Sequence, residues 1–256
     1  MPNLKDIYKK YVPSEARFWL YKMRHYSEVE SLKHTVFPSE KGDFSLRRYY
    51  QNKAIFVHIT KAAGTSLALS LFGELPYHYT AQQYRVIFGR KHFNNCFKFT
   101  FVRNPWDRLY SAYSYLTGGG WNEDDANWAR INLSNVKDFN DFVMNWLTEE
   151  KLNSHIHLRP QHKFICDRKN KPIIDYIGYF ETIQEDFDNI SNKLGLTNKN
   201  LKHTNASKRA GYREIYTQDS IKKVYDLYKF DIVSLGYQFD GLHRKTVLNR
   251  NFVDYE

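Results

Sequence analysis

AIFVHITKAAGTS, residues 54–66, is the stretch of this chain that decides its fold. Its first six residues are a nearly continuous apolar run, which is typical of a strand buried on both faces of a parallel sheet. Small residues then make a short loop, and apolar positions resume after Ser66 in a helical stretch. The stretch therefore predicts a strand, a tight loop and a helix, and the start of such a helix offers backbone N–H groups to an anion.

The loop itself carries groups that suit a phosphate. Small side chains at Ala63 and Gly64 let the backbone come close to an anion, Thr65 and Ser66 add hydroxyl donors, and Lys61 adds a mobile positive charge. The loop is not a Walker A motif, because its lysine precedes the glycine by three residues and no glycine opens it. An ordinary strand-turn-helix with a solvated lysine is the plain alternative.

A second junction between strand and helix begins at residue 97. Phe97–Val102 (FKFTFV) predicts another buried strand, and an asparagine followed by proline suits the start of a helix over about residues 105–117. Arg103 stands at the end of this strand, where a guanidinium can hold a phosphate through two parallel hydrogen bonds. Ser111, two turns into the helix, can reach the same phosphate. Alternatively, Arg103 pairs with a nearby carboxylate and only holds the helix.

The rest of the chain continues the alternation of strands and helices. A third strand is predicted at Ile173–Phe180, and helices are predicted at Phe139–Leu147, Gln184–Leu194 and Gln218–Phe230. This order predicts an α/β fold, a parallel sheet flanked by helices on both faces. Ligands of such sheets bind beyond the carboxyl ends of the strands, where both junctions lie. We expect an accessory segment over residues 1–50 and a single domain over residues 51–256.

Charge and cysteine content narrow the function classes only in part. The 256-residue chain has a net charge of +10, so its surface attracts anions, whether nucleotide, nucleic acid, acidic polysaccharide or membrane. Cys96 and Cys166 are too few for a disulfide framework, and we expect two buried thiols. Residues 1–30 lack the apolar core of a signal peptide and the length of a membrane span, which indicates a cytoplasmic protein. Peripheral contact of this basic, aromatic segment with the inner membrane face is left open.

Taken together, the two junctions resemble the motifs of the PAPS-dependent carbohydrate sulfotransferases, PAPS being 3′-phosphoadenosine-5′-phosphosulfate. In particular, they resemble the type that includes the chondroitin and heparan 2-O-sulfotransferases and their bacterial relatives. The family's 5′-phosphosulfate loop reads HIPKTAGTS, and His58–Ser66 differs from it at Thr60 and Ala62. Its 3′-phosphate motif reads FVRNPxxRxxSxY, which Phe101–Tyr113 matches throughout. Weaker similarity extends the resemblance over about residues 53–240.

The resemblance implies a P-loop-like fold and a role for each matching residue. Lys61 would contact the 5′-phosphosulfate and steady the oxygen that leaves. The cofactor-binding set implied by the resemblance is Lys61, Ala63, Gly64, Thr65 and Ser66 for the 5′ side, Arg103 and Ser111 for the 3′-phosphate, and Ser207, Arg209 and Tyr212 closing over the nucleotide. The implied reaction moves a sulfuryl group from PAPS to a hydroxyl of a glycan or glycolipid acceptor, without a metal.

Two histidines are candidates for the base that takes the acceptor's proton, because histidine suits proton transfer near neutral pH. His78 lies between the two motifs, where family members carry an active histidine, and His157 lies in a stretch that resembles the family's HxxPQ-like sequence. A carboxylate or no protein base remains open. No metal site is predicted, because His155, His157 and His162 lack a carboxylate or cysteine at ligand spacing.

The acceptor and two other function classes stay open at this point. The basic and aromatic residues of segments 117–128 and 155–162 are candidate acceptor contacts, and Trp121 and Trp128 either stack on sugar rings or belong to the core. A P-loop kinase would need a Mg²⁺ ligand and the Walker lysine, and the sequence has neither signal. A non-catalytic binder of nucleic acid or acidic glycan explains the charge but not the placement of Lys61 and Arg103. We therefore expect no nucleic acid partner.

Overall fold

One parallel sheet organises the part of the chain that the computed structural model describes, namely residues 12–24, 26, 46–75, 77–196, 200–201 and 211–242. Its strands are β1 (Ala54–Val57), β2 (Phe97–Val102) and β3 (Tyr176–Tyr179), in the order β1-β2-β3. β2 pairs with β1 on one side and with β3 on the other, and both pairings are parallel. The prediction of three parallel strands is confirmed, although the third is shorter than expected.

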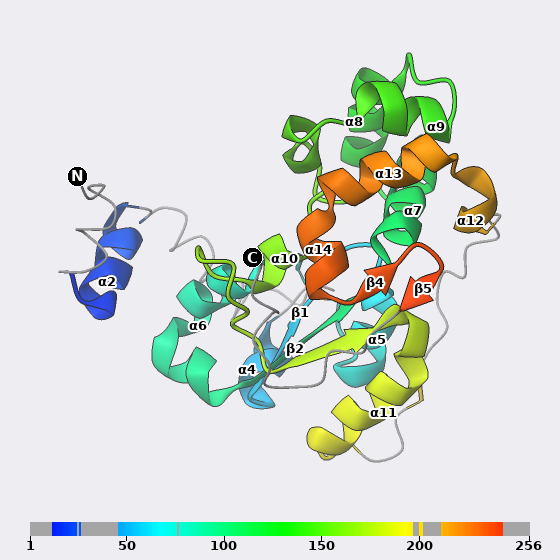
Figure 1. Cartoon of the computed structure of the whole chain (residues 1–256). Helices are drawn as coiled ribbons and strands as arrows, with labels where there is room; N and C mark the ends of the chain where they lie inside the picture. The colour runs from blue at the N-terminus through cyan, green and yellow to red at the C-terminus, as the bar shows by residue number, and fades with distance from the viewer. Residues whose placement is uncertain are drawn as a thin grey trace.

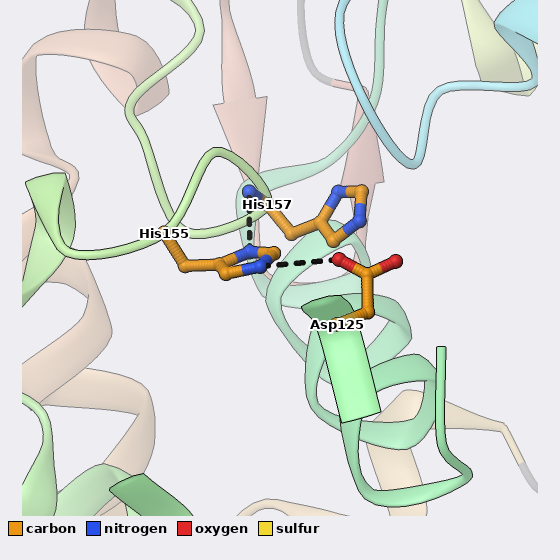
Figure 2. A group of neighbouring side chains, drawn as sticks. All are labelled: Asp125, His155 and His157. Carbon is orange, nitrogen blue, oxygen red and sulfur yellow. Dashed lines mark hydrogen bonds and ion pairs between the residues drawn. The ribbon is translucent and has the colours of Figure 1, made fainter. Parts of the chain in front are cut away.

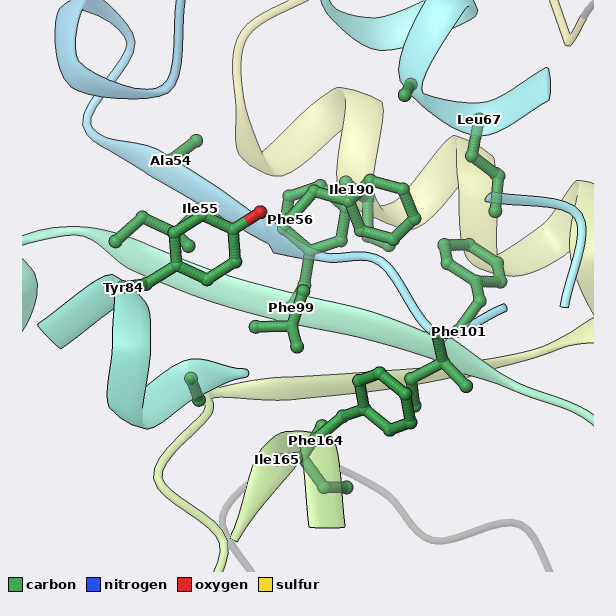
Figure 3. Packing of buried hydrophobic residues seen from close by; sticks show 14 of the residues in the cluster. Ala54, Ile55, Phe56, Leu67, Tyr84, Phe99, Phe101, Phe164, Ile165 and Ile190 are labelled. Atoms are coloured by element: carbon green, nitrogen blue, oxygen red, sulfur yellow. The ribbon is translucent and has the colours of Figure 1, made fainter. Parts of the chain in front are cut away.

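Helices cover both faces of this sheet (Figure 1). Helices α5 (Gly64–Leu71) and α11 (Ile183–Lys193) lie on one face, while α6 (Ala81–Asn95) and α10 (His162–Ile165) lie on the other (Figure 3). All four residues of β1 are buried, as their continuous apolar run requires. The same core reaches back to the short helix α4 (Arg47–Gln51), through Leu46 at its N-cap and Tyr49 within it.

A second apolar cluster is built almost wholly from helices that follow β2 and β3 (Figure 1). These helices are α7 (Pro105–Thr117), α8 (Glu123–Leu133), α9 (Phe139–Asp141), a π-helical turn (Phe142–Trp146), α12 (Tyr212–Ile215), α13 (Gln218–Leu227) and α14 (Lys229–Ser234). The helix predicted at about residues 105–117 is confirmed as α7. As its Asn-Pro start indicated, the Asn104 side chain accepts the Trp106 backbone N–H and Pro105 begins the helix. The helix predicted at Phe139–Leu147 is divided by the π-helical turn, and the one predicted at Gln218–Phe230 is divided at Tyr228, whereas the one predicted at Gln184–Leu194 is confirmed as α11.

Two of the longer described helices, α6 and α8, escape the sequence prediction. Helix α6 mixes aromatic and polar side chains around its axis and contains Gly89 in a left-handed conformation, so no apolar stripe marks it. Its start is nevertheless fixed by a capping box between Thr80 and Gln83. Helix α8 begins at an Asn122 cap, inside the segment that the sequence suggested only as an acceptor contact.

The smaller elements complete the described chain. They are α2 (Ser14–Arg24), 3-10 turns at Glu150–Asn153 and Phe180–Thr182, and an antiparallel pair of β4 (Tyr237–Gln238) and β5 (Gly241–Leu242). Cys96 and Cys166 are free and buried, as expected, and burial raises the pKa of these thiols to about 11 and about 12. Among the described helices, none combines the length and apolar character needed to cross a bilayer.

Candidate functional site

The loop after β1 has an uncommon backbone. Lys61 and Ala63 both adopt left-handed backbone conformations, with φ of 64° and 59°. Residues other than glycine rarely adopt such conformations. Ala63 is the N-cap of α5 and has no side-chain oxygen to satisfy the first N–H groups of that helix. The strained loop therefore ends in a helix start whose backbone donors lack a side-chain cap, which is a suitable place for an anion.

Gly64 is required at this helix start because the ring of His58 lies directly against it. A Cβ built on Gly64 would lie 1.7 Å from His58 Cδ2 and 2.8 Å from Cγ. The His58 ring is buried and stacks on Phe56 of β1, so it has little room to withdraw. The close approach of ring and backbone sets the shape of the loop, which gives His58 a structural role.

Gly64→Ala should therefore lower the free energy of unfolding by about 1–3 kcal/mol, the usual effect of forcing extra atoms into a packed site. Thermal unfolding measures the change. Gly211→Ala is the matched control, because a Cβ at Gly211 would meet nothing within 4 Å. A Gly64→Ala protein with the same thermal midpoint as the Gly211→Ala protein would show that the His58 ring moves freely.

Lys61 lies against an aromatic ring that the sequence did not single out. Its Nζ is 3.8 Å from the ring centre of Tyr115 in α7, a favourable cation–π distance. The Tyr115 hydroxyl donates to Asp125 Oδ2 at 2.6 Å. Tyr115 lies four residues after Ser111, so both share one helix face, and that spacing was the available sequence signal. The tyrosine thus positions the lysine beside the loop.

Thr60 stands where the resembling loop has proline, and its hydrogen bonds hold this position of the loop in place. Its hydroxyl donates to the Ile156 carbonyl at 3.3 Å and accepts from Arg108 Nη2 at 3.2 Å. Arg108 also donates through Nε to the Thr60 carbonyl and through Nη1 to the Arg159 carbonyl, each at 2.9 Å. Since Arg108 is fully buried, it braces the loop on α7 instead of offering its charge to a ligand.

Arg103 stands at the end of β2, beside the loop that follows β1. Its Nε and Nη2 contact Asp107 Oδ2 at 2.7 and 2.6 Å, and its Nη1 donates to the Lys61 carbonyl at 3.1 Å. The guanidinium also lies 4.1 Å from the ring centre of Phe180, which follows β3. The pairing with a carboxylate is therefore present, and it holds the guanidinium at the edge where the ends of all three strands meet.

Gln161 fixes the backbone of Arg103. The fully buried amide accepts the Arg103 N–H through Oε1 and donates to the Arg103 carbonyl through Nε2, both at 2.9 Å. The buried carboxylate of Asp231 accepts in turn from the N–H groups of Gln161 and His162. Sequence reasoning gave neither residue a role, because these contacts join positions about 58 and 70 residues apart.

Both candidate bases lie near Lys61. His78 Nδ1 is 3.2 Å from the His58 carbonyl, and burial lowers the pKa of His78 despite that bond. The His157 ring packs edge-on against Tyr115 at 4.7 Å. Burial, followed by the positive charge of Lys61, lowers the pKa of His157 to about 2. The tertiary structure thus gathers two histidines, 79 positions apart in sequence, beside one lysine, and keeps both neutral at physiological pH.

Comparison with known proteins relates this chain to a protein family. A sequence profile described as the sulfotransferase family matches residues 49–238, well over half of the chain. The chain belongs to the sulfotransferase family. It is also 32% identical, over 128 residues, to an uncharacterized protein of Archaeoglobus fulgidus, and the match covers 50% of this chain and 91% of that protein. No solved structure matches the chain.

The sulfotransferase match contains every residue placed at the sheet edge. Ser66 and Ser111 are buried in α5 and α7, and Thr65 is half-buried beside Ser66. Tyr212 begins α12, and its hydroxyl donates to the Phe239 carbonyl. Burial raises the pKa of Tyr212, and the negative charges of Asp107 and Glu181 act in the same direction. The predicted contacts Ser207 and Arg209 lie outside the described residues.

One group in this sulfotransferase could be read as a metal site. Ligand atoms of Asp125, His155 and His157 all lie within 4.8 Å of one another (Figure 2). The argument that the histidines lack a carboxylate partner was therefore wrong, because α8 supplies Asp125 from 30 positions away. His155 Nδ1 accepts the His157 backbone N–H at 3.3 Å, so its Nε2 carries the proton that faces Asp125.

That tautomer favours a hydrogen-bonded network over a cation site. A metal-bound histidine donates from its second nitrogen, whereas the second nitrogen of His155 accepts. Asp125 also accepts from the Tyr115 hydroxyl and the Trp121 N–H. The carboxylate thus links Lys61, through Tyr115, to the start of α8 and to His155.

Proposed function

We propose that this sulfotransferase uses PAPS as its donor and transfers the sulfuryl group to a hydroxyl of a glycan or glycolipid. The observation that carries the proposal is the meeting of Lys61 and Arg103, from two adjacent parallel strands, at the start of α5. The Arg103 guanidinium donates to the Lys61 carbonyl at 3.1 Å, so the two cationic residues are tied together. Two charges and a helix start at one edge suit a nucleotide with phosphates on both its 3′ and 5′ sides.

In this proposal, each residue neutralises or holds a defined charge. The donor supplies an activated sulfuryl group, whose bond to a phosphate oxygen breaks as a new bond to the acceptor oxygen forms. The α5 N–H groups, Thr65 and Ser66 form a P-loop-like cradle for the 5′-phosphate. Lys61 stabilises the negative charge that develops on the leaving oxygen, and Arg103 with Ser111 holds the 3′-phosphate.

His78 is the better of the two candidate bases. Its Nδ1 faces a carbonyl oxygen, which only a protonated nitrogen satisfies, so the neutral ring keeps an unprotonated Nε2. A base needs such a lone pair, and the His58 carbonyl orients the ring as a carboxylate does in a catalytic triad. His157 is more strongly disfavoured as a proton acceptor, because Lys61 and Arg108 add positive charge around it.

The acid side of the pH–rate profile should distinguish the two histidines. With His78 as the base, kcat/KM should be constant at neutral pH and fall below about pH 6.5, since the lowered pKa of His78 keeps the ring neutral above it. With His157 as the base, no such fall should occur until about pH 2 is approached. The rate is followed as adenosine 3′,5′-bisphosphate released from PAPS with a panel of oligosaccharide acceptors.

Substitution gives the second arm of that measurement. His78→Asn should reduce the rate by roughly 10²–10⁴-fold, the usual contribution of a general base. His157→Asn should retain most of the activity and the acid limb. The reverse pattern would transfer the base to His157.

The donor is tested by the thermal midpoint with adenosine 3′,5′-bisphosphate and, separately, with ATP and Mg²⁺. A ligand that binds only the folded protein, at 100 times its Kd, stabilises it by about 2.7 kcal/mol. We expect this rise with the bisphosphate alone and its loss in a Lys61→Ala/Arg103→Ala variant. A rise with ATP and Mg²⁺ alone would favour a kinase, and no rise with either ligand would contradict the proposed donor.

The acceptor side is proposed at the start of α8. Trp121 is 72% exposed, and its backbone N–H donates to the Asp125 carboxylate. That carboxylate is linked to Lys61 through Tyr115. An exposed indole next to polar groups suits stacking on a sugar ring. Trp128, by contrast, packs against Trp146 and His155, as a core residue would.

A further inference from the structure

Helix α2 carries a large exposed apolar surface. Trp19, Leu20 and Met23, with the helical Tyr26 two residues after Arg24, have exposed fractions of 59%, 43%, 58% and 66%. Of the large hydrophobic side chains exposed among the described residues, ten in all, these four lie within eight positions of one another. Scattered apolar residues are ordinary on a protein surface, but a contiguous patch indicates an interaction site.

The four side chains share one side of the helix. At about 100° per residue they fall within an arc of about 120°, which we call the α2 apolar arc. On the same helical projection Lys22 and Arg24, both in the last turn, border this arc on its two sides. An apolar strip with a cationic border is the pattern of helices that lie in a membrane interface.

The other side of α2 is held against the domain. The Phe18 ring centre is 5.4 Å from the guanidinium carbons of both Arg85 and Arg90 in α6. Figure 1 shows α2 next to α6, at the outside of the molecule. Because Phe18 lies away from the α2 apolar arc on the helical projection, this contact leaves the arc facing outward.

We propose that the α2 apolar arc docks on the surface of an anionic phospholipid bilayer. Tryptophan and tyrosine favour the boundary between headgroups and acyl chains, and lysine and arginine reach lipid phosphates from its edge. Residues 1–26 contain six lysines and arginines against two acids, and the chain as a whole carries +10. A purely apolar protein groove would offer no counter-charge to Arg24, or to Lys22, whose Nζ otherwise lies 4.9 Å from the Phe18 ring centre. This inference is independent of the sulfuryl chemistry.

Co-sedimentation of the full chain with lipid vesicles tests the proposal. We expect binding to vesicles of phosphatidylcholine with phosphatidylglycerol, little binding to phosphatidylcholine alone, and weaker binding at high salt. Trp19→Ser/Met23→Ser should lower the partition coefficient by roughly tenfold or more, because two apolar side chains no longer enter the interface. Lys22→Ser/Arg24→Ser should remove most of the preference for anionic lipid.

Tyr225→Ser/Met144→Ser is the matched control, because it removes one aromatic and one methionine side chain from exposed positions elsewhere, at 36% and 39% exposure. It should bind vesicles like the unmodified chain. Equal loss in both double variants, or no binding of the unmodified chain to anionic vesicles, would overturn the proposal. Self-association that disappears only in Trp19→Ser/Met23→Ser, without vesicle binding, would assign the arc to a second copy instead.

Discussion

Lys61→Met should lower turnover by roughly 10²–10³-fold, which is the usual effect of removing one group that stabilises developing charge in a transition state. Methionine keeps the length of the side chain and can still pack on the Tyr115 ring, where Lys61 Nζ now lies at 3.8 Å. The charge is therefore the main property removed. Donor binding should weaken less than turnover, because Arg103 and the start of α5 remain. Release of adenosine 3′,5′-bisphosphate from PAPS, measured at saturating donor, gives the turnover.

Lys151→Met is the matched control for this variant. Lys151 also lies over an aromatic ring, with its Nζ 4.9 Å from the ring centre of Trp146. It belongs to the 3-10 turn at Glu150–Asn153 and not to the loop after β1. Turnover should be unchanged there, within about twofold. Similar losses in both variants would mean that lysine–aromatic contacts stabilise the fold, and that Lys61 has no special part in the chemistry.

Arg103→Lys should abolish most of the preference for adenosine 3′,5′-bisphosphate over adenosine 5′-monophosphate. A hydrogen bond to a charged group contributes about 1.5–3 kcal/mol, so the ratio of the two Kd values should fall by roughly 10- to 100-fold. Lysine keeps the charge but cannot form the paired bonds of a guanidinium. Calorimetric titration with the two nucleotides measures the ratio. The comparison cancels any loss that affects both ligands equally.

Asp107→Asn separates the two roles that Arg103 could have. Asp107 is the carboxylate that Arg103 contacts through Nε and Nη2. If Arg103 holds the 3′-phosphate, removing the competing negative charge should preserve the nucleotide preference or increase it. If the ion pair only braces α7, Asp107→Asn should reduce the affinity for both nucleotides to a similar degree, and the preference should not depend on Arg103.

Local sequence was sufficient for the parts of the fold that depend on neighbours in the chain. The apolar run at β1 and the Asn-Pro start of α7 each predicted an element whose position the structure confirms. The placement of Lys61 and Arg103 at one edge also followed, because parallel strands end on the same side of a sheet. Helix α6 was missed because its burial comes from packing beside α10 and β1, which leaves no helical stripe in the sequence.

The surroundings of those two residues were decided by tertiary structure. Tyr115 reaches Lys61 across 54 positions, and Gln161 reaches the Arg103 backbone across 58. Asp125 joins His155 only because α8 packs beside the turn that carries the histidines. The sequence by itself determined the strands, the short loop after β1 and the cations at the strand ends, since periodicity and turn chemistry act over a few residues. Which side chains brace, orient or neutralise those cations depended on the packing of distant segments, which no local pattern encodes.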